Sequence, residues 1–324
     1  MNRRSTVSFI ATLPWVLAQL AHAQQIAASR VGVILHGGPQ FEVLDGLKAG
    51  FKDLGLQEGQ HFALDVRDAK GDLSAVEEAA RSLERSKVSL IYAVNTSVST
   101  RVHRTTTSIP IVFAVGSDPV RAGLVASFAN PGGRLTGVHF YSEDLTAKRL
   151  SILKETLPGL RRVVTFYNPG NEVALVSMNL AREAAAQLKI EIVERRVASV
   201  EELRLALSTL DTKNTGAFYY VSDGMISSQG QLIVDTARAR KLPTMFHEHS
   251  LVAHGALASY GVSYHEVGRV SARYVQQILA GASPQNLAVE SVSRVGLSLN
   301  LKTARELGLT IPQSVRLQAD KIIE

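Results

Sequence analysis

Short polar segments follow several apolar runs of the sequence, and their side chains are suited to holding a small charged molecule. Asn95, Thr96 and Ser97 precede a helix-like segment. Free N–H groups at a helix start bind a carboxylate or phosphate, and the hydroxyl of Thr96 or Ser97 adds a contact. Asp223 lies in another such segment, where its carboxylate suits a ligand ammonium group. The simpler alternatives are helix capping at 95–97 and an Asx turn before Gly224.

Further candidates occupy equivalent positions after other apolar runs. Ligands of open α/β sheets bind beyond the carboxyl ends of the strands, so these loops are expected to surround one cleft. Tyr141, Tyr260 and Tyr264 lie near the expected hinge, where each either stacks on a ligand or packs the hinge. Asp118 precedes Pro119 and is expected mainly to cap the start of a helix. The further candidate ligand contacts are His36, Ser117, Asp118, Tyr141, Asn168, Asn171, Ser222, His247 and Tyr264.

Motifs of the common enzyme classes are missing. The sequence has no Gly-x-Ser-x-Gly elbow, no Gly-x-Gly-x-x-Gly loop after the first strand and no phosphate-loop lysine motif. It has no cysteine, which excludes thiol catalysis. A metal site at His247 and His249, with His36 as a third ligand, remains an alternative that requires a bent backbone. We therefore expect a binding protein that is not an enzyme and has no cofactor or metal.

Apolar runs and helical patterns alternate along the chain. Short continuous apolar runs suit parallel strands that helices cover on both faces, and they occupy residues 31–35, 90–94, 109–115, 163–167, 216–221, 242–246 and 257–261. Between the first two runs, Leu73, Val76, Ala80 and Leu83 recur at helical spacing. This alternation predicts a doubly wound α/β fold.

The second half repeats the plan of the first, at an offset of roughly 130 residues, about one domain length. We therefore expect two Rossmann-like lobes, each with a doubly wound parallel sheet, and a cleft between them. The first lobe is predicted to comprise residues 24–140 and about 265–283. The second is predicted to comprise residues 141–264 and about 284–324. The short connection at 140–143 is expected to act as a hinge.

The first 23 residues have the pattern of an export signal. Arg3 and Arg4 precede an apolar run that ends in Ala21-His22-Ala23, the small-x-small pattern of a cleavage site. The alternative is a buried N-terminal helix. Cleavage after Ala23 leaves a net charge of +6 − 2 = +4, without the basic stripe typical of nucleic-acid binding. We therefore expect a periplasmic protein that is not embedded in a membrane and binds no nucleic acid.

The sequence resembles one family of ABC-transporter substrate-binding proteins, which includes tryptophan- and phenylalanine-binding members. The specific segments are IPIVFAVGSDPV at 109–120, AGLV at 122–125, PGG at 131–133 and LTGV at 135–138. Weaker matches, such as Tyr167-Asn168-Pro169, extend the resemblance over nearly the whole mature chain. It implies a type I periplasmic-binding fold with three crossings between the lobes. It also implies ligand contacts from the loops at 95–97, 117–118, 168–172 and 222–224.

By this resemblance, the protein is the periplasmic solute-binding subunit of an ABC importer. Its lobes would close on an amino acid or related small carboxylate and deliver it to an inner-membrane permease with its ATPase. The sequence departs from the aromatic-amino-acid binders at 94–98, 170–173 and 222–224, so the ligand need not be aromatic. The alternatives are a periplasmic sensor subunit that binds the same ligand, and a metal-dependent or hydrolytic enzyme on the same fold.

Overall fold

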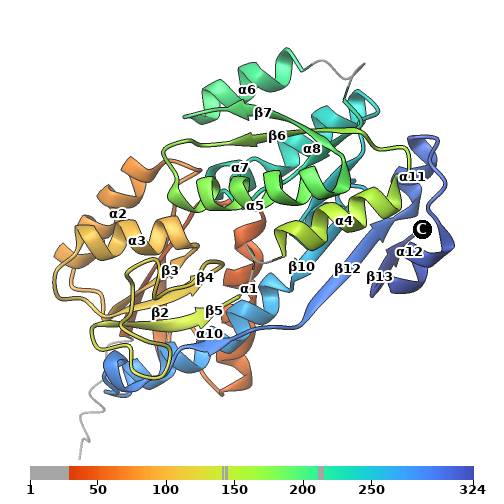
Figure 1. The fold of residues 1–324 in the computed structure, drawn as a ribbon. Helices are drawn as coiled ribbons and strands as arrows, with labels where there is room; N and C mark the ends of the chain where they lie inside the picture. The colour runs from red at the N-terminus through yellow and green to blue at the C-terminus, as the bar shows by residue number, and fades with distance from the viewer. Residues whose placement is uncertain (1–28, 141, 143–144, 211–214) are drawn as a thin grey trace, which may run out of the picture.

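The computed structural model describes residues 29–140, 142, 145–210 and 215–324, and it forms two lobes around two β-sheets (Figure 1). The predicted signal segment and Tyr141 lie outside the described residues. The first sheet has the strand order β11-β5-β4-β3-β1-β2. Its strands are β1 Ser29–Leu35, β2 Phe62–Asp68, β3 Leu90–Val94, β4 Ile111–Val115, β5 Leu135–His139 and β11 Glu290–Ser291.

The second sheet has the order β13-β12-β10-β9-β8-β6-β7. Its strands are β6 Arg162–Tyr167, β7 Glu191–Arg196, β8 Ala217–Tyr219, β9 Thr244–Phe246, β10 Ala258–Val262, β12 Val295–Asn300 and β13 Lys321–Ile323. Neighbouring strands of the two sheets run parallel, apart from the antiparallel pair β10 and β12. The predicted architecture of two parallel-sheet α/β lobes is thereby confirmed.

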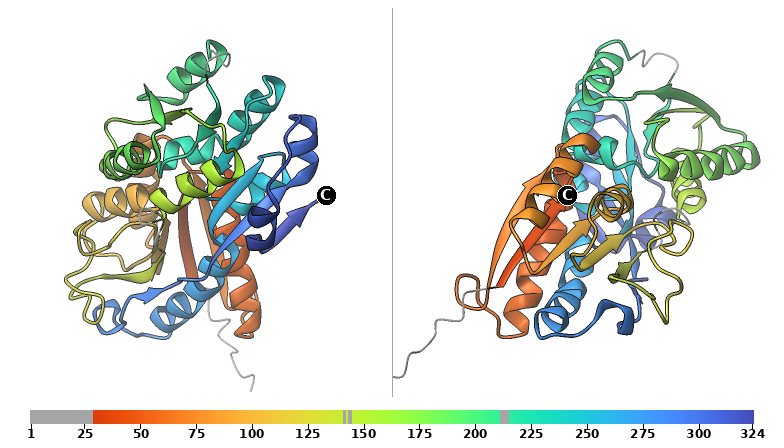
Figure 2. Two further views of the ribbon diagram at one scale, coloured as in Figure 1. Left: turned by 45° about the vertical axis from the view of Figure 1, so that its right-hand side comes forward. Right: turned by 90° about the vertical axis from the view of Figure 1, so that its left-hand side faces the viewer.

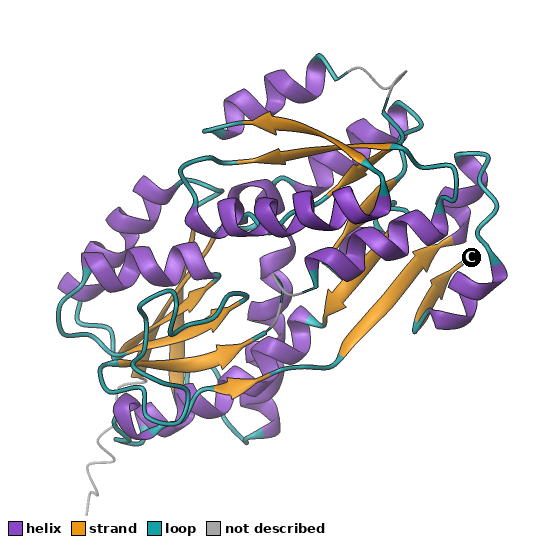
Figure 3. Cartoon of the chain, viewed as in Figure 1, coloured by secondary structure: helices purple, strands orange, loops and turns teal. Residues whose placement is uncertain are grey.

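Helices cover both faces of each sheet, because the buried strands are apolar on both sides (Figure 3). On the first sheet, α1 Phe41–Asp53 and α10 Tyr264–Leu279 cover one face, and α2 Leu73–Arg85 and α3 Thr96–Thr105 cover the other. The 3-10 turn η1, Gly38–Gln40, precedes α1.

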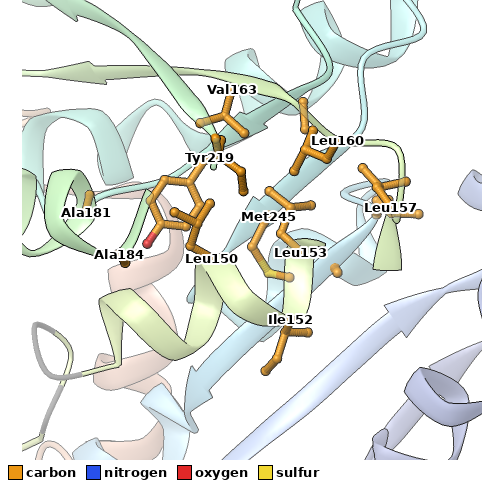
Figure 4. Packing of buried hydrophobic residues seen from close by; sticks show 14 of the residues in the cluster. Leu150, Ile152, Leu153, Leu157, Leu160, Val163, Ala181, Ala184, Tyr219 and Met245 are labelled. Carbon is orange, nitrogen blue, oxygen red and sulfur yellow. The ribbon is translucent and has the colours of Figure 1, made fainter. Parts of the chain in front are cut away.

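The second lobe has a separate core on each face of its sheet. One face carries α4 Thr146–Thr156, α5 Glu172–Leu188, α11 Leu301–Glu306 and α12 Gln313–Gln318. The other carries α6 Val200–Ser208, α7 Gly224–Ser228, α8 Gly230–Ala239 and α9 His249–Ala253. Figure 4 shows Leu150 and Leu153 of α4 beside Tyr219 and Met245 of the strands. No helix of the described residues is long and apolar enough to cross a membrane.

The chain passes between the lobes three times. The views of Figure 2 show one result, since α10, drawn in blue, lies in the same lobe as the orange N-terminal elements. The passages lie between β5 and α4, between β10 and α10, and between β11 and β12. The expected boundary at 284 differs from the structure. Glu290 and Ser291 pair with β5, and Val289 and Val292 are buried in the first lobe. The last passage therefore lies between 291 and 295.

Two further expectations differ from the structure. No helix follows Asp118, because the segment after it forms turns in which Asp118 accepts hydrogen bonds from the N–H groups of Val120 and Arg121. The strands β2 and β7 were not predicted. Both are half-exposed edge strands with charged residues, such as Asp65 and Glu194, so they lack the continuous apolar runs of the central strands.

Candidate ligand-binding cleft

The two sheets place their polar loops on either side of one interlobe cleft. In each sheet the strand order reverses at one point, between β1 and β3 in the first lobe and between β6 and β8 in the second. Ligands of doubly wound sheets bind beyond the carboxyl ends of the strands at such a point. His36 and Asn95 follow β1 and β3, and Asn168 and Ser222 occupy corresponding places after β6 and in the loop after β8.

A small enclosed cavity of about 20 Å³ lies at the centre of this cleft. It brings together seven of the predicted site residues: Asn95, Thr96, Ser117, Ser222, Asp223, His247 and Tyr264. The cavity has room for about one water molecule, so the lobes lie close together at this point of the cleft. A larger ligand requires them to move apart.

The first-lobe wall of the cavity is a set of hydroxyl and amide groups at the N-terminus of α3. Asn95 has a positive φ of 90°, and its Oδ1 accepts hydrogen bonds from the backbone N–H of Ser97 at 2.9 Å and from the Ser97 hydroxyl at 2.8 Å. Thr96 Oγ1 lies 3.1 Å from Ser117 Oγ. This wall therefore presents hydroxyl groups beside the positive end of a helix dipole.

His36 closes the first-lobe wall as a neutral side chain. The Ser97 hydroxyl donates its hydrogen to Asn95. The Ser97 oxygen therefore accepts from His36 Nε2–H, at a distance of 3.3 Å. Burial lowers the pKa of His36 to about 4, although Asp72 raises it slightly. The Nδ1 atom of His36 is then a buried acceptor, and it has no hydrogen-bond partner among the described residues.

The second-lobe wall centres on Asp223, which is 2 % exposed. Its Oδ1 accepts hydrogen bonds from the N–H groups of Met225 and Ile226, so it caps α7. Its Oδ2 accepts from the N–H of Asn168 at 2.8 Å. Burial raises the pKa of Asp223, while these N–H groups and Asn171 lower it. Asp223 is thus both a helix cap and a buried acid in the cavity wall.

A buried polar layer lies behind the cavity at the hinge end. His247 Nε2 is hydrogen-bonded to the Tyr264 hydroxyl and lies 3.2 Å from Glu248 Oε1. Burial raises the pKa of Glu248 to about 7. Burial lowers the pKa of His247, and the positive charge of Arg149 lowers this pKa further. The guanidinium of Arg149 donates to the carbonyls of Ser142 and Tyr260, so it joins the first passage to β10, the strand that leads into the second.

Two wider cavities along the cleft contain the other described candidates. The cavity between α3 and α5 has a volume of about 180 Å³ and is lined by Ser97, Asp118 and Asn171. A larger groove of about 1030 Å³ on the side of β2 and α6 is lined by His36 and Asn168. All twelve predicted residues that the structure describes therefore line the cleft or its openings.

Sequence reasoning missed several residues of the central cavity. These are Phe140, Ser142, Val173 and Tyr220. Tyr220 and Phe140 directly follow strands, so their strand-end positions were a signal for them. Ser142 lies in the expected hinge, and its hydroxyl is 2.9 Å from that of Ser222.

The histidines of the 247–249 segment are engaged in hydrogen bonds. His249 Nδ1 lies 2.9 Å from Ser259 Oγ, and its Nε2 lies 3.0 Å from the carbonyl oxygen of Gly261. Within the described part of the chain, no group of three or more His, Asp or Glu residues is arranged to hold a metal ion. The metal alternative therefore has no support from this geometry.

Two doubly wound lobes, joined by three passages and facing one cleft, define the type I periplasmic-binding fold, and its members are the structural neighbours of this chain. The chain belongs to the family of ABC transporter substrate binding proteins, whose model matches residues 29–323. The resemblance seen in residues 109–138 is thereby confirmed.

Individual relatives agree with this assignment. The chain is 28% identical over 284 residues to a tyrosine-binding protein of Clostridioides difficile, a match that covers 86% of this chain and 80% of that protein. A solved structure of a conserved domain protein from Vibrio cholerae is 29% identical, with a TM-score of 0.82 over 91% of this chain and 99% of its own. An ABC domain from Streptococcus pneumonia in complex with L-Trp is 23% identical, with a TM-score of 0.81 over 91% of this chain and 100% of its own.

Proposed function

We propose that this protein is the periplasmic solute-binding subunit of an ABC importer, and that its lobes close by a hinge motion on an amino acid or related small carboxylate. The single observation that carries the ligand class is the pairing of unlike walls across one cavity. Hydroxyl groups at a helix N-terminus form the first-lobe wall, and a buried carboxylate forms the second. The permease and its ATPase would be the membrane partners of this subunit.

The chemistry of the two walls matches a zwitterion. The ligand carboxylate would accept from Thr96, Ser117 and the N-terminus of α3. The ligand ammonium would bind Asp223, whose charge has no cationic side chain beside it among its hydrogen-bond partners. A buried carboxylate gains from such a cation, since burial alone disfavours its charged form. Each charge-assisted contact contributes about 1.5–3 kcal/mol.

Closure would follow from the position of these groups on different lobes. Only a closed cleft lets one ligand touch both walls, so the ligand binds the closed state more tightly and shifts the population toward it. The buried layer of Arg149, Glu248 and Tyr264 would hold the hinge end rigid while the open ends of the cleft move. The relative that binds tyrosine supports an amino acid as the first ligand to test.

The test is a thermal-shift screen of the mature protein with amino acids, small carboxylates, sugars and nucleosides, followed by calorimetry on Asp223→Asn. We expect an amino acid or small carboxylate to raise the melting temperature, with one site per chain. Asp223→Asn should weaken amino-acid binding about tenfold or more, which corresponds to about 1.4 kcal/mol. A neutral sugar as the only tight ligand would overturn the proposed ligand class.

A matched control separates binding from stability. Asp223→Asn also turns an acceptor into a donor opposite the N–H of Asn168, so some loss of stability is expected. Asp320→Asn makes the same change where Asp320 Oδ2 accepts from the N–H of Leu297, and Asp320 does not line the cavity. Asp320→Asn should lower the stability of the protein without weakening ligand binding. Equal effects of the two variants on affinity would contradict a direct role of Asp223.

A further inference from the structure

The short helix α7 of the second lobe lies directly against loops of the first lobe. At its first residue, a Cβ on Gly224 would lie 2.7 Å from Cδ2 of His36 and 3.1 Å from Nδ2 of Asn95. Real Cβ atoms essentially never come within 3.0 Å of another atom, so a side chain at 224 would require the buried ring of His36 to move.

The other end of α7 meets a second glycine. A Cβ on Gly38 would lie 2.8 Å from the carbonyl oxygen of Ser228 and 3.1 Å from that of Ser227. The obstacle here is backbone, which cannot turn away as a flexible side chain can. A third glycine, Gly71, lies beside Ser228: its Cβ would be 2.8 Å from Ser228 Oγ. We call these contacts of α7 with Gly38, Gly71, His36 and Asn95 the α7 seam.

We propose that the α7 seam is the closure contact of the cleft, and that glycine at 38 and 224 is required for the lobes to close fully. This inference rests on the proposed hinge closure. Gly224 and Gly38 belong to different lobes, so their close contacts vanish when the lobes separate. The seam therefore determines how far the lobes close, in addition to the walls that hold the ligand.

The backbone conformation makes Gly224 the selective probe. Gly38 has a φ of +57° and Gly71 of +90°, so a side chain there is strained whether the cleft is open or closed. Gly224 is the first residue of α7 and has no positive φ. Alanine at 224 fits the open form, where it also favours the helix, and clashes with His36 only on closure.

The experiment traps closure with a disulfide and needs no ligand. In a disulfide each Cβ lies about 3.0 Å from the sulfur of its partner, close to the 2.8 Å between the Cβ position of residue 71 and Ser228 Oγ. Gly71→Cys/Ser228→Cys would place the only cysteines in the chain. The rate at which this double variant oxidises to the crosslinked form is compared with the rate for the triple variant that also carries Gly224→Ala. The control is Gly159→Ala, because nothing lies within 4 Å of a Cβ there.

We expect Gly224→Ala to slow crosslinking at least about tenfold, the effect of 1.4 kcal/mol, and Gly159→Ala to leave it unchanged. In a protein without the cysteines, Gly224→Ala should weaken the binding of L-tyrosine, which serves as the probe ligand. It should not lower the melting temperature of the free protein. Unchanged crosslinking with Gly224→Ala would overturn the seam. If crosslinking slows but no amino acid binds the wild type, the seam stands and the proposed ligand class fails.

Discussion

Glu248 and Arg149 are buried charged side chains that lie behind the cleft without an ion pair between them in the described structure. Glu248 Oε1 accepts from the Ser227 hydroxyl, while its Oε2 and Arg149 Nη1 have no hydrogen-bond partner among the described residues. A buried carboxyl in this position favours its neutral form. Its protonation therefore links the stability of the hinge end to pH.

The pH dependence of this link has a defined sign. Burial raises the pKa of Glu248 from its usual 4.5 to about 7 in the folded protein. The folded state therefore binds the proton more tightly, and stability falls as pH rises from 4.5 to 7. At 1.36 kcal/mol per unit, the cost reaches about 3 kcal/mol. Glu248→Gln removes this cost and still accepts from Ser227. In urea unfolding, its stability relative to the wild type should rise by up to about 3 kcal/mol between pH 5 and pH 8.

Comparison with a variant isolates Glu248 from other groups. The lowered pKa values of His36 and His247 act in the opposite direction, since they favour the folded state as pH rises toward 6.5, but they are common to both proteins. Glu155→Gln on the exposed face of α4 is the control. A difference between Glu248→Gln and wild type that stays constant with pH would show that Glu248 is ionised throughout.

At the scale of single residues, the polar loops of the sequence predicted seven of the residues that line the central cavity. Asn95, Thr96 and Asp223 were predictable because short polar residues after an apolar run mark the carboxyl end of a strand. Arg149 and Glu248 were not, because their burial depends on how the passages between the lobes fold back. The sequence alone could not distinguish two roles for Asp223, since a helix cap and a ligand contact require the same residue type at the same place.

At the scale of elements, α1 and α10 are the most tightly joined pair in the first lobe. A Cβ on Gly46 would lie 1.9 Å from the carbonyl oxygen of His265, and one on Gly268 would lie 1.9 Å from that of Val43. The two helix backbones are therefore in direct contact. Val267, Val270, Tyr274 and Ile278 recur at the spacing typical of an amphipathic helix. The contact itself could not be predicted, because it depends on the crossing of two helices far apart in sequence.

This contact gives a prediction opposite to helix propensity. Glycine to alanine in an exposed helix stabilises by about 1 kcal/mol. Gly268→Ala should instead destabilise by roughly 1–3 kcal/mol, the usual cost of overpacking, because α1 must move away. Urea unfolding measures the change. Lys48→Ala, on the exposed face of α1, should stay within about 0.5 kcal/mol of wild type. A Gly268→Ala protein as stable as wild type would mean that the helices are not packed this closely.

The central strands of each sheet were predicted more reliably than the edge strands, because the two kinds of strand are buried to different extents. A strand with helices on both faces must be apolar throughout, as in Ile111–Val115, whereas β2 and β7 have one neighbouring strand and exposed side chains. The two-residue strand β11 shows the limit of this signal. Its two residues do not show which sheet they join, so the last passage between the lobes was predicted too early.

The whole molecule is two similar lobes whose relative position depends on three passages and on the α7 seam. The internal repeat predicted the lobes, because each half carries the same order of strands and loops. It did not predict how closely they meet, since that depends on glycines that touch only in the assembled molecule. Closure should therefore be controllable at Gly71 and Ser228 of the seam, neither of which lines the central cavity.

A covalent lock at the seam tests this directly. Oxidised Gly71→Cys/Ser228→Cys should hold the lobes together, so that the central cavity keeps its volume of about 20 Å³ and a ligand cannot enter. Calorimetry with L-tyrosine, or with the tightest ligand of the thermal-shift screen, should show no binding by the oxidised protein and recovery of binding after reduction. The single variants Gly71→Cys and Ser228→Cys should bind under both conditions. If the oxidised and reduced forms of the double variant bind the ligand equally well, the ligand reaches its site without separation of the lobes at α7.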